Sequence, residues 1–344
     1  MSSSQNNPCD LPSEIAWGDC VAIQSPARLH FGLLEVCAGQ DRLFGGLGAM
    51  IEQPSTQLSL KINPSSVPNK PWTCNIDAEE PWRSRIESVL NRWITSNGNP
   101  GLPSIQIRLE NQPRMHAGLG SGTQIACATV SLLSHWSKTE SPMSTENLAK
   151  ITQRGKRSYV GLAGHRQGGF IIDHGVATSG VERKIDHYDI PQEWCVVLAK
   201  PLSTATISGV VENDYFGQSQ FPNPYRDSMW EQIQNEIIPA LNAGDLAQFG
   251  SALYEYGRDA GRVFAKVQGG IYRDQVVASL IDWIRSQGVL ATGQTSWGPT
   301  VYAILSNQVD ADELLRQLSL RFSTDIEVMT TRFNRTGCYR VDKA

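Results

Sequence analysis

Strand-like and helix-like patterns alternate along this chain of 344 residues. Seven stretches are rich in β-branched and aromatic residues and are bounded by turn residues, which is typical of strands. They are Val21–Val36, Thr56–Ile62, Ser104–Leu109, Phe170–Val176, Trp194–Lys200, Thr300–Leu305 and Ile326–Phe333. Three other stretches repeat apolar residues at the spacing of an amphipathic helix, namely Trp82–Trp93, Trp230–Leu241 and Val276–Ile284. The alternation is compatible with an α+β or an α/β protein.

One more helix is predicted near the C-terminus. Asp310 followed by Glu313, just ahead of Leu314 and Leu315, is a capping-box pattern that marks a helix start. The length of the chain suggests two domains, and the change from mainly strand to mainly helix pattern places their boundary near Trp194. We therefore expect a polar tail over residues 1–20, an N-terminal domain over residues 21–193 and a C-terminal domain over residues 194–344.

Composition excludes several classes of protein. Charged residues make up 19% of the chain and the formal net charge is −4, so there is no basic surface of the kind that binds nucleic acid. The N-terminus has neither a basic nor an apolar segment, and no run of apolar residues is long enough to span a bilayer, so we expect a cytoplasmic protein without membrane attachment. The seven cysteines never form C-x-x-C, which argues against a disulfide framework and a zinc site. Binding of small anions must therefore come from local sites.

The most informative stretch is the sequence QPRMHAGLGSGTQI at residues 112–125. It has the pattern of a strand, a glycine-rich turn and the start of a helix. Such a turn leaves backbone N–H groups free at a helix N-terminus, where the helix dipole adds positive potential, and this combination favours phosphate binding. The alternative is that the glycines only make a tight connection. The candidate phosphate-binding residues are Gly118, Gly120, Ser121, Gly122, Thr123 and Gln124.

This turn fits neither of two common phosphate-loop signatures, because no lysine follows the last glycine and the pattern G-x-G-x-x-G is not met. It resembles instead the second motif of the GHMP small-molecule kinase superfamily, P-x-x-x-G-L-G-S-S/G. The run Gly118–Gly122 matches the glycine part of that motif, and Pro113 lies one residue further upstream than the motif has it. The continuation resembles a non-kinase branch, the β-ribofuranosylaminobenzene 5′-phosphate synthases, whose loop reads H-x-G-L-G-S-G-T-Q. The run His116–Gln124 matches that loop without a gap.

Two further motifs of the superfamily occur in the expected order. Residues 25–34 (SPARLHFGLL) resemble its opening strand, and residues 45–54 (GGLGAMIEQP) resemble the turn and second strand that follow. Residues 294–304 (QTSWGPTVYAI) resemble the third motif, in which a small-residue turn closes over the active site. A glycine pair at residues 267–270 (VQGG) also has a counterpart in the synthase branch. Three ordered motifs are far more specific than one glycine turn.

The segment after the glycine turn distinguishes a kinase from a synthase. Many GHMP kinases carry an aspartate there that activates the substrate hydroxyl, but no acidic residue occurs between Glu146 and Asp173. Its place is taken by basic residues, which hold anions rather than remove a proton; they are Lys156, Arg157, His165 and Arg166. We therefore predict no kinase activity. This segment departs from the archaeal synthases and resembles the bacterial members, so the resemblance fixes the branch better than the substrate.

The resemblance implies a two-domain GHMP kinase-like fold, with an N-terminal domain like ribosomal protein S5 domain 2, a ferredoxin-like C-terminal domain and an active site between them. It also implies that phosphoribosyl pyrophosphate condenses with 4-amino- or 4-hydroxybenzoate to give a C-riboside, with release of carbon dioxide and pyrophosphate. This is an early step towards methanopterin-type one-carbon carriers. Two other classes stay open, an ATP-dependent GHMP small-molecule kinase and a catalytically silent phosphometabolite-binding protein. The sequence also leaves open whether the chain forms a homodimer.

Residues inside these motifs are candidates for the chemistry that the resemblance implies. The substrate anions need cationic partners, for which the candidates are Arg28, His30, Arg157 and His165. Mg²⁺ or another divalent cation binds through few carboxylates together with substrate oxygens, and its candidate ligands are Glu35, Glu52 and Asp173. Further substrate contacts are expected from Ser158, Gln268, Ser296, Trp297 and Gly298. The alternatives are a surface ion pair for the first two cationic candidates and a structural role for Asp173.

Overall fold

The computed structural model describes residues 20–35, 42–63, 74–97, 104–112, 117–136, 143–177, 183–202 and 223–341. Nearly all of the expected tail, residues 1–19, lies outside this part of the chain, as do Pro113 and His116. No helix in the described ranges is long and apolar enough to cross a membrane. Two main sheets organise the fold, one of seven strands and one of four.

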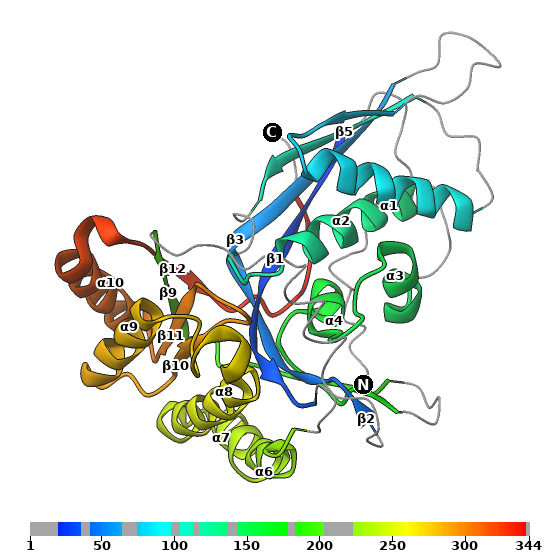
Figure 1. Cartoon of the computed structure of the whole chain (residues 1–344). Helices are drawn as coiled ribbons and strands as arrows, with labels where there is room; N and C mark the ends of the chain where they lie inside the picture. The colour runs from blue at the N-terminus through cyan, green and yellow to red at the C-terminus, as the bar shows by residue number, and fades with distance from the viewer. Residues whose placement is uncertain are drawn as a thin grey trace, which may run out of the picture.

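The larger sheet is built on a long antiparallel pair of strands, β1 (Cys20–Leu33) and β3 (Gly46–Asn63), which runs through the N-terminal half (Figure 1). The strand order is β13-β1-β3-β5-β4, and β6 and β8 continue the sheet from β3. The remaining strands are β4 (Cys74–Asp77), β5 (Ser104–Asn111), β6 (Phe170–Asp173), β8 (Ile185–Tyr188) and β13 (Tyr339–Val341). A separate pair joins β2 (Arg42–Leu43) to β7 (Val176–Ala177). Every strand predicted in this half is present, and β3 begins well before Thr56.

Four helices lie on one side of this sheet (Figure 1). They are α1 (Trp82–Ser96), α2 (Ser121–Trp136), α3 (Thr145–Thr152) and α4 (Val160–Gln167). The predicted helix at Trp82 is confirmed, because its apolar residues Ile86, Val89, Leu90 and Trp93 are buried in one core with the strands. α2 begins directly after the glycine turn, as the pattern predicted.

The smaller sheet has the order β10-β11-β9-β12, and all of its neighbouring strands are antiparallel. Its strands are β9 (Cys195–Pro201), β10 (Thr292–Gln294), β11 (Val301–Leu305) and β12 (Ile326–Arg332). Helices separate β9 from β10 and β11 from β12 along the chain. This order and connectivity are those of a ferredoxin-like domain, as the resemblance implied.

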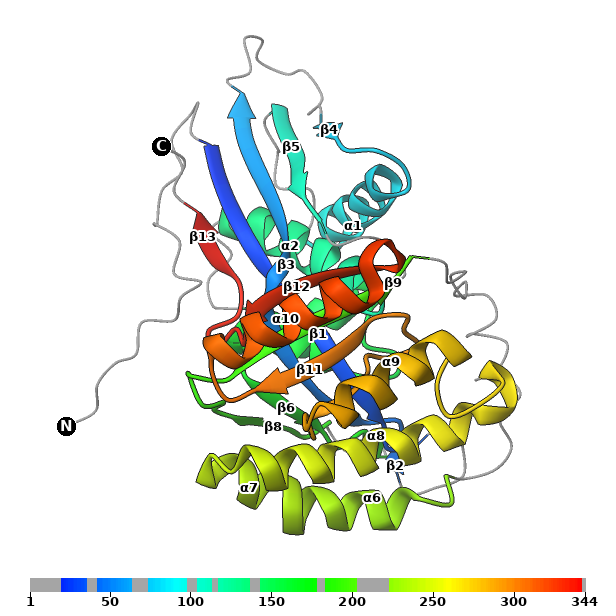
Figure 2. The ribbon, with the colours of Figure 1, turned by 90° about the vertical axis from the view of Figure 1, so that its left-hand side faces the viewer.

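Helices cover both faces of the smaller sheet. α9 (Gln275–Ser286) and α10 (Gln308–Phe322) lie on one face (Figure 2), where Val277 and Leu314 share a core with Val197 of β9. The other face receives α6 (Arg226–Gln232), the π-helical turn η1 (Ile233–Ile237), α7 (Ile238–Ala243) and α8 (Leu246–Gln268). A short 3-10 turn, η2 (Ser323–Asp325), follows α10. α8 was not predicted from the sequence, although its buried residues Phe249, Leu253, Tyr256 and Ala260 recur at helical spacing.

The predicted capping box is displaced by one turn. Asn307 caps α10, because its side-chain oxygen accepts the backbone N–H of Asp310 at 3.0 Å. The helix therefore begins at Gln308, and Asp310 lies in its first turn, where a negative charge complements the helix dipole. The prediction of a helix is confirmed, while its predicted start is wrong.

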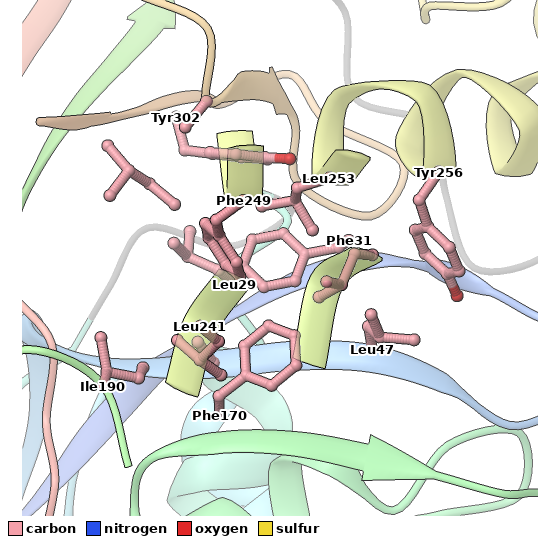
Figure 3. Packing of buried hydrophobic residues seen from close by; sticks show 14 of the residues in the cluster. Leu29, Phe31, Leu47, Phe170, Ile190, Leu241, Phe249, Leu253, Tyr256 and Tyr302 are labelled. Atoms are coloured by element: carbon pink, nitrogen blue, oxygen red, sulfur yellow. The ribbon is translucent and has the colours of Figure 1, made fainter. Parts of the chain in front are cut away.

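A single core joins the two sheets (Figure 3). Phe31 of β1 packs between Phe170 of β6 and Tyr302 of β11, with ring centroids 5.9 and 5.1 Å away. Phe249 of α8 also contacts Phe170, at 5.8 Å between centroids. This core fixes β1 against the C-terminal half. The last strand, β13, lies in the C-terminal half of the sequence but pairs with β1 of the N-terminal half. The domain limits 21–193 and 194–344 stay a prediction.

Candidate active site

A cavity of about 440 Å³ lies where the two halves meet. Its lining comes from β1, the first turn of α2, the segment 153–158, α8 with the loop after it, and the turn at 292–297. Eight predicted site residues line it, namely Arg28, His30, Thr123, Arg157, Ser158, Gln268, Ser296 and Trp297. The structure therefore brings together residues from all three motifs.

Hydrogen bonds of the main chain hold these motifs against one another. The N–H of Arg28 donates to the carbonyl of Leu119 at 3.0 Å. The N–H of His30 donates to Thr295 Oγ1 at 2.9 Å, and the N–H of Ser296 donates to the carbonyl of His30 at 2.8 Å. The opening strand, the glycine turn and the third motif are thus fixed relative to one another independently of what their side chains bind.

The glycine turn requires its glycines. Gly118 and Gly120 have φ angles of +80° and +74°, in the left-handed region that favours glycine. A Cβ atom on Gly118 would lie 2.5 Å from the carbonyl oxygen of Thr295, and one on Gly120 would lie 3.3 Å from Cβ of Arg28. Thr123, in the first turn of α2, lines the cavity. The helix N-terminus therefore opens at the cavity, a geometry that favours an anion.

Arg28 passes between two residues that lack side chains. Cβ atoms on Gly120 and Gly161 would lie 3.4 Å from its Nε and 3.5 Å from its Cδ, respectively. The two glycines therefore leave room for the arginine to run along the turn and reach the cavity.

Gln124 and His165 belong to the interior rather than to the described cavity lining. Gln124 Nε2 donates to the carbonyl of Gly161 at 2.8 Å, and its Oε1 accepts from Ser25 Oγ at 2.7 Å. His165 places Nδ1 2.8 Å from Ser25 Oγ and Nε2 2.9 Å from Ser131 Oγ. These side chains join β1, α2 and α4, so neither is available to hold a substrate anion.

The two predicted histidines are also not cations. Burial, together with the charge of Arg28, lowers the pKa of His30 well below its usual range. Burial, with a contribution from Arg166, lowers the pKa of His165 to about 3. Both imidazoles are therefore neutral near pH 7, which corrects the expectation that they pair with substrate anions as charged groups. Among the four predicted cationic partners, Arg28 and Arg157 are the two that line the cavity with a positive charge.

A buried ion pair positions the segment 153–158. Asp173 Oδ1 lies 3.3 Å from Nε of Arg183, and Asp173 Oδ2 accepts the N–H of Tyr159 at 2.6 Å. Arg183 donates from Nη1 to the carbonyl of Gly155 at 2.9 Å and from Nη2 to the carbonyl of Arg157 at 3.2 Å. Because these bonds hold the main chain at Gly155, Arg157 and Tyr159, they orient Arg157 and its neighbours at the cavity. Asp173 is thus a structural anchor, which was the alternative reading.

The predicted metal ligands are dispersed. Glu35 is buried and accepts the N–H of Asn223 at 3.0 Å, while Glu52 is exposed on β3. None of the described residues that line the cavity is an aspartate or a glutamate, whereas Arg28, Arg154, Lys156, Arg157 and Arg258 are cations. Within the described ranges, no cluster of three histidine, cysteine or acidic residues could hold a metal ion. A divalent cation bound by Glu35, Glu52 or Asp173 at this cavity therefore does not fit.

The C-terminal side of the cavity is aromatic. The rings of Phe264 and Trp297 lie 4.9 Å apart, and Tyr254 and Tyr272 also line this side. Ser296 and Trp297 are held in a turn whose first residue has a φ angle of +54°. Gly298, although predicted to contact substrate, lies outside the described lining, and a Cβ there would lie 3.0 Å from Cδ of Gln294. Gln268 Nε2 donates hydrogen bonds to the carbonyl of Gly261 at 3.2 Å and to the carbonyl of Ile271 at 2.7 Å.

Comparison with known proteins identifies the family. The family described as "GHMP kinases N terminal domain" matches residues 85–173, and the one described as "GHMP kinases C terminal" matches residues 237–324. The chain belongs to the GHMP kinase superfamily. A homoserine kinase from Cytophaga hutchinsonii has the same GHMP fold, with a TM-score of 0.69 and 15% identity over 95% of this chain and 99% of that one. A mevalonate pyrophosphate decarboxylase from Streptococcus pyogenes has a TM-score of 0.62 and 14% identity over 94% and 99%. The expected two-domain GHMP kinase-like fold is confirmed.

Curated relatives identify the branch within this GHMP superfamily. The beta-ribofuranosylphenol 5'-phosphate synthase of Methanothermobacter thermautotrophicus is 28% identical over 299 residues, which are 82% of this chain and 88% of the relative. The protein of the same name from Methanocaldococcus jannaschii is 26% identical over 333 residues, covering 92% and 98%. The resemblance to the synthase branch, drawn above from the glycine turn, is confirmed.

Several residues at this GHMP cavity have no local signal in the sequence. Arg183 matters because the fold brings it beside the segment 153–158, where it bonds two carbonyls. Arg154 matters because its place in the fold puts it in the cavity lining. Tyr254 and Arg258 lie on α8, which the sequence reading missed. Recognising that helix from its apolar spacing would have suggested that the opposite, partly polar face looks towards the cavity.

Proposed function

We propose that this protein condenses phosphoribosyl pyrophosphate with a para-substituted benzoate to form a C-riboside 5′-phosphate, with release of pyrophosphate and carbon dioxide. The proposal extends to a place in the synthesis of a methanopterin-type one-carbon carrier. The names of the curated relatives support a ribofuranosylphenol phosphate synthase. The observation that carries the proposal is a cavity whose N-terminal side is cationic and whose C-terminal side is aromatic, with no carboxylate among its described lining residues. One side suits a sugar phosphate and the other suits a benzene ring.

The reaction balances without a further reactant. The bond between C1 of the ribose and the pyrophosphate oxygen breaks, and positive charge develops at C1. A π-electron pair of the ring carbon that bears the carboxylate forms the new C–C bond to C1. The bond to the carboxylate carbon then breaks, its electron pair restores the aromatic ring, and carbon dioxide leaves. Neither a proton acceptor nor an oxidant is required.

The residues at the cavity match these needs. A leaving pyrophosphate is stabilised by preorganised N–H donors and guanidinium groups, which the turn at Gly118–Gly122 and Arg28 supply. Lys156, Arg157 and Ser158 offer charge and a hydroxyl to the 5′-phosphate or to the benzoate carboxylate. The rings of Phe264 and Trp297 offer a stacking surface for the acceptor. We assign no step to a metal held by Glu35, Glu52 or Asp173, because these carboxylates are not in the described lining.

The cavity offers little support for the kinase alternative. A kinase of small alcohols needs a base that accepts the hydroxyl proton, and removal of a general base typically costs about 10²- to 10⁴-fold in rate. No carboxylate among the described lining residues could take that role. We therefore expect no ADP formation from ATP in the presence of small alcohols.

The assay that tests the proposal combines the protein with phosphoribosyl pyrophosphate, Mg²⁺ and either 4-aminobenzoate or 4-hydroxybenzoate. We expect pyrophosphate release that depends on one of the two benzoates and that is absent without it. A parallel assay replaces these substrates with ATP and a panel of alcohols. No pyrophosphate release with either benzoate would favour a silent phosphometabolite-binding protein, and alcohol-dependent ADP formation would instead identify a kinase.

A further inference from the structure

Two arginines that no motif includes meet at the first turn of α2. Arg85 projects from α1 and Arg154 follows α3 in the chain, yet both guanidinium groups lie beside Gly122, the second residue of α2. A Cβ atom on Gly122 would overlap Arg85 Nη1 and would lie 3.6 Å from Arg154 Nη2. Gly122 therefore admits these side chains to the helix N-terminus. Arg154 also lines the cavity, so the pair is continuous with the candidate active site.

This arrangement is electrostatically unfavourable when no anion is bound. Both arginines are partly buried, and Arg154 lies close enough to Arg85 that burial and this like charge together lower the pKa of Arg85 to about 10. The N-terminus of α2 adds its own positive potential. Among the described residues, neither guanidinium makes a hydrogen bond or an ion pair, and that of Arg85 lies over the ring of Trp82, 5.1 Å from its centroid. Partly buried charges are normally paired, so this pair of guanidinium groups is suited to bind an anion.

The turn has a third arginine on its other side. The guanidinium of Arg28 lies beside Gly120, because a Cβ there would be 3.7 Å from Arg28 Cζ. Arginines from three separate elements, β1, α1 and the segment after α3, thus converge on one helix N-terminus. This is more positive charge than a single carboxylate or monoester phosphate needs. Lys156 and Arg157 are placed further along the segment 153–158, where a second anionic group of the same substrate could bind.

We propose that Arg85 and Arg154, with the first turn of α2, form the seat of the substrate's diphosphate group and neutralise its charge without a metal ion held by a protein carboxylate. The proposal deepens the function proposed above and rests on it for the identity of the substrate. Two guanidinium forks and the free N–H groups of a helix end present donors to several diphosphate oxygens at once. A divalent cation would then enter only together with the substrate.

The test measures binding rather than turnover. Inorganic pyrophosphate is titrated calorimetrically into the wild-type protein in the presence of EDTA, and then into Arg85→Gln, Arg154→Gln and the double variant. Each single variant removes charged hydrogen-bond donors from the anion, so each should weaken the Kd about tenfold or more. Arg321→Gln, on the exposed side of α10, is the matched control and should bind as the wild type does. Thermal unfolding of each variant shows whether it is folded.

Three outcomes would overturn the proposal. They are an unchanged Kd in the folded double variant, wild-type binding of pyrophosphate only when Mg²⁺ is present, and equal losses in Arg321→Gln. If a glutamine variant fails to fold, Gly122→Ala replaces it, because the added methyl group displaces Arg85 and should also weaken binding at least severalfold. Normal pyrophosphate affinity in folded Gly122→Ala would count against the seat.

The seat and the proposed function can fail separately. Arginine-dependent binding of pyrophosphate by a protein that makes no riboside would leave the seat in place and remove the function. Riboside formation with an unchanged KM for phosphoribosyl pyrophosphate in the double variant would leave the function in place and remove the seat.

Discussion

The two sides of the cavity differ in chemistry and in origin. The N-terminal side, built by β1, the glycine turn and the segment 153–158, carries Arg28, Arg154, Lys156 and Arg157. The C-terminal side, built by α8 and the loops beyond it, carries Tyr254, Phe264, Tyr272 and Trp297, and its cation Arg258 already pairs with Glu255 at 3.1 Å. The two proposed substrates, a charged sugar phosphate and a benzene ring, need opposite surroundings. Each half of the fold supplies one of these two surroundings, so the two proposed substrates can meet in the cavity between the halves.

The two sides also differ in how they are held in place. The cationic segment is anchored by a buried ion pair, Arg183 with Asp173, whose side chains are 4% and 0% exposed. The aromatic side is braced by hydrogen bonds from Gln294 Nε2 to the carbonyl of Ser296 at 3.0 Å and from Arg273 Nη1 to the carbonyl of Trp297 at 3.2 Å. The carboxylate next to Arg273, that of Asp274, is not buried but 33% exposed. A single substitution in the buried residues that hold the cationic side should therefore lower the free energy of unfolding more than one that affects the aromatic side.

The largest expected effect is on the anchor of the cationic side. Arg183→Leu leaves Asp173 buried without its partner, and breaking a buried pair in this way costs about 3–5 kcal/mol in the free energy of unfolding. Urea denaturation measures that loss. The double variant Arg183→Leu/Asp173→Asn should recover part of it, while Arg316→Leu, which breaks an exposed pair with Glu313, should change little. A loss below about 1 kcal/mol in Arg183→Leu would show that the anchor does not matter.

The next effect concerns the glycine turn. Gly120→Ala introduces a methyl group 3.3 Å from Cβ of Arg28 and should displace that arginine. The contact requires a shift of a few tenths of an ångström, so kcat/KM should fall by at most the about 10²-fold that a misplacement of about 1 Å at a binding group can cost. Gly288→Ala is the control, because Gly288 has a φ angle of +86° and nothing within 4 Å of its added Cβ. Both variants should lose about 1–2 kcal/mol of stability from the left-handed backbone, but only Gly120→Ala should lose activity. Equal kinetics in the two would exclude the turn from the site.

Arg157 tests whether the cationic side grips the substrate. If its guanidinium binds a substrate anion, Arg157→Ala should lose about 1.5–3 kcal/mol of transition-state binding, which is about 10- to 150-fold in kcat/KM. Arg157→Lys should recover only part, because an ammonium lacks the forked geometry. Steady-state kinetics and thermal unfolding are measured together, with Arg321→Ala as an exposed control. Wild-type kinetics in Arg157→Ala would remove this residue from the account.

The smallest effect is expected on the aromatic side. Trp297→Leu removes a ring that lies 4.9 Å from Phe264, and such aromatic contacts are worth about 0.5–1.5 kcal/mol. The KM for the benzoate should therefore rise about two- to twelvefold, while the KM for phosphoribosyl pyrophosphate stays unchanged. Trp283→Leu removes a comparable ring, 5.4 Å from Phe322 on the far side of the smaller sheet, and should change neither KM. A rise in both KM values for Trp297→Leu would contradict the division of the cavity between two substrates.

Much of the site could be predicted because three motifs carry it. Arg28, Thr123 and Trp297 lie in or beside motif positions, and all three line the cavity. A motif does not show which of its side chains point inward. Gln124 and His165 were therefore predicted at the site, but they are buried among hydroxyl and carbonyl groups.

The residues that could not be predicted depend on distant contacts. Arg183 acts on the carbonyls of Gly155 and Arg157, and Arg85 reaches Gly122 from another helix. A lone arginine carries no local sign of such a contact. In the fold, the predicted strands were found from β-branched and aromatic residues. By contrast, α8 was missed although Gly244 ends α7 and Asp245 caps α8, because three glycines interrupt its apolar pattern, namely Gly250, Gly257 and Gly261.

One measurement tests most directly whether the cavity joins a sugar phosphate to an aromatic ring. The protein is incubated with phosphoribosyl pyrophosphate, Mg²⁺ and a benzoate labelled with ¹³C in its carboxylate, and labelled carbon dioxide and pyrophosphate are quantified over the same time course. We expect one labelled carbon dioxide for each pyrophosphate, with a product whose ribose C1 is bonded to a ring carbon. Pyrophosphate release without labelled carbon dioxide, or no release of either, would contradict this account.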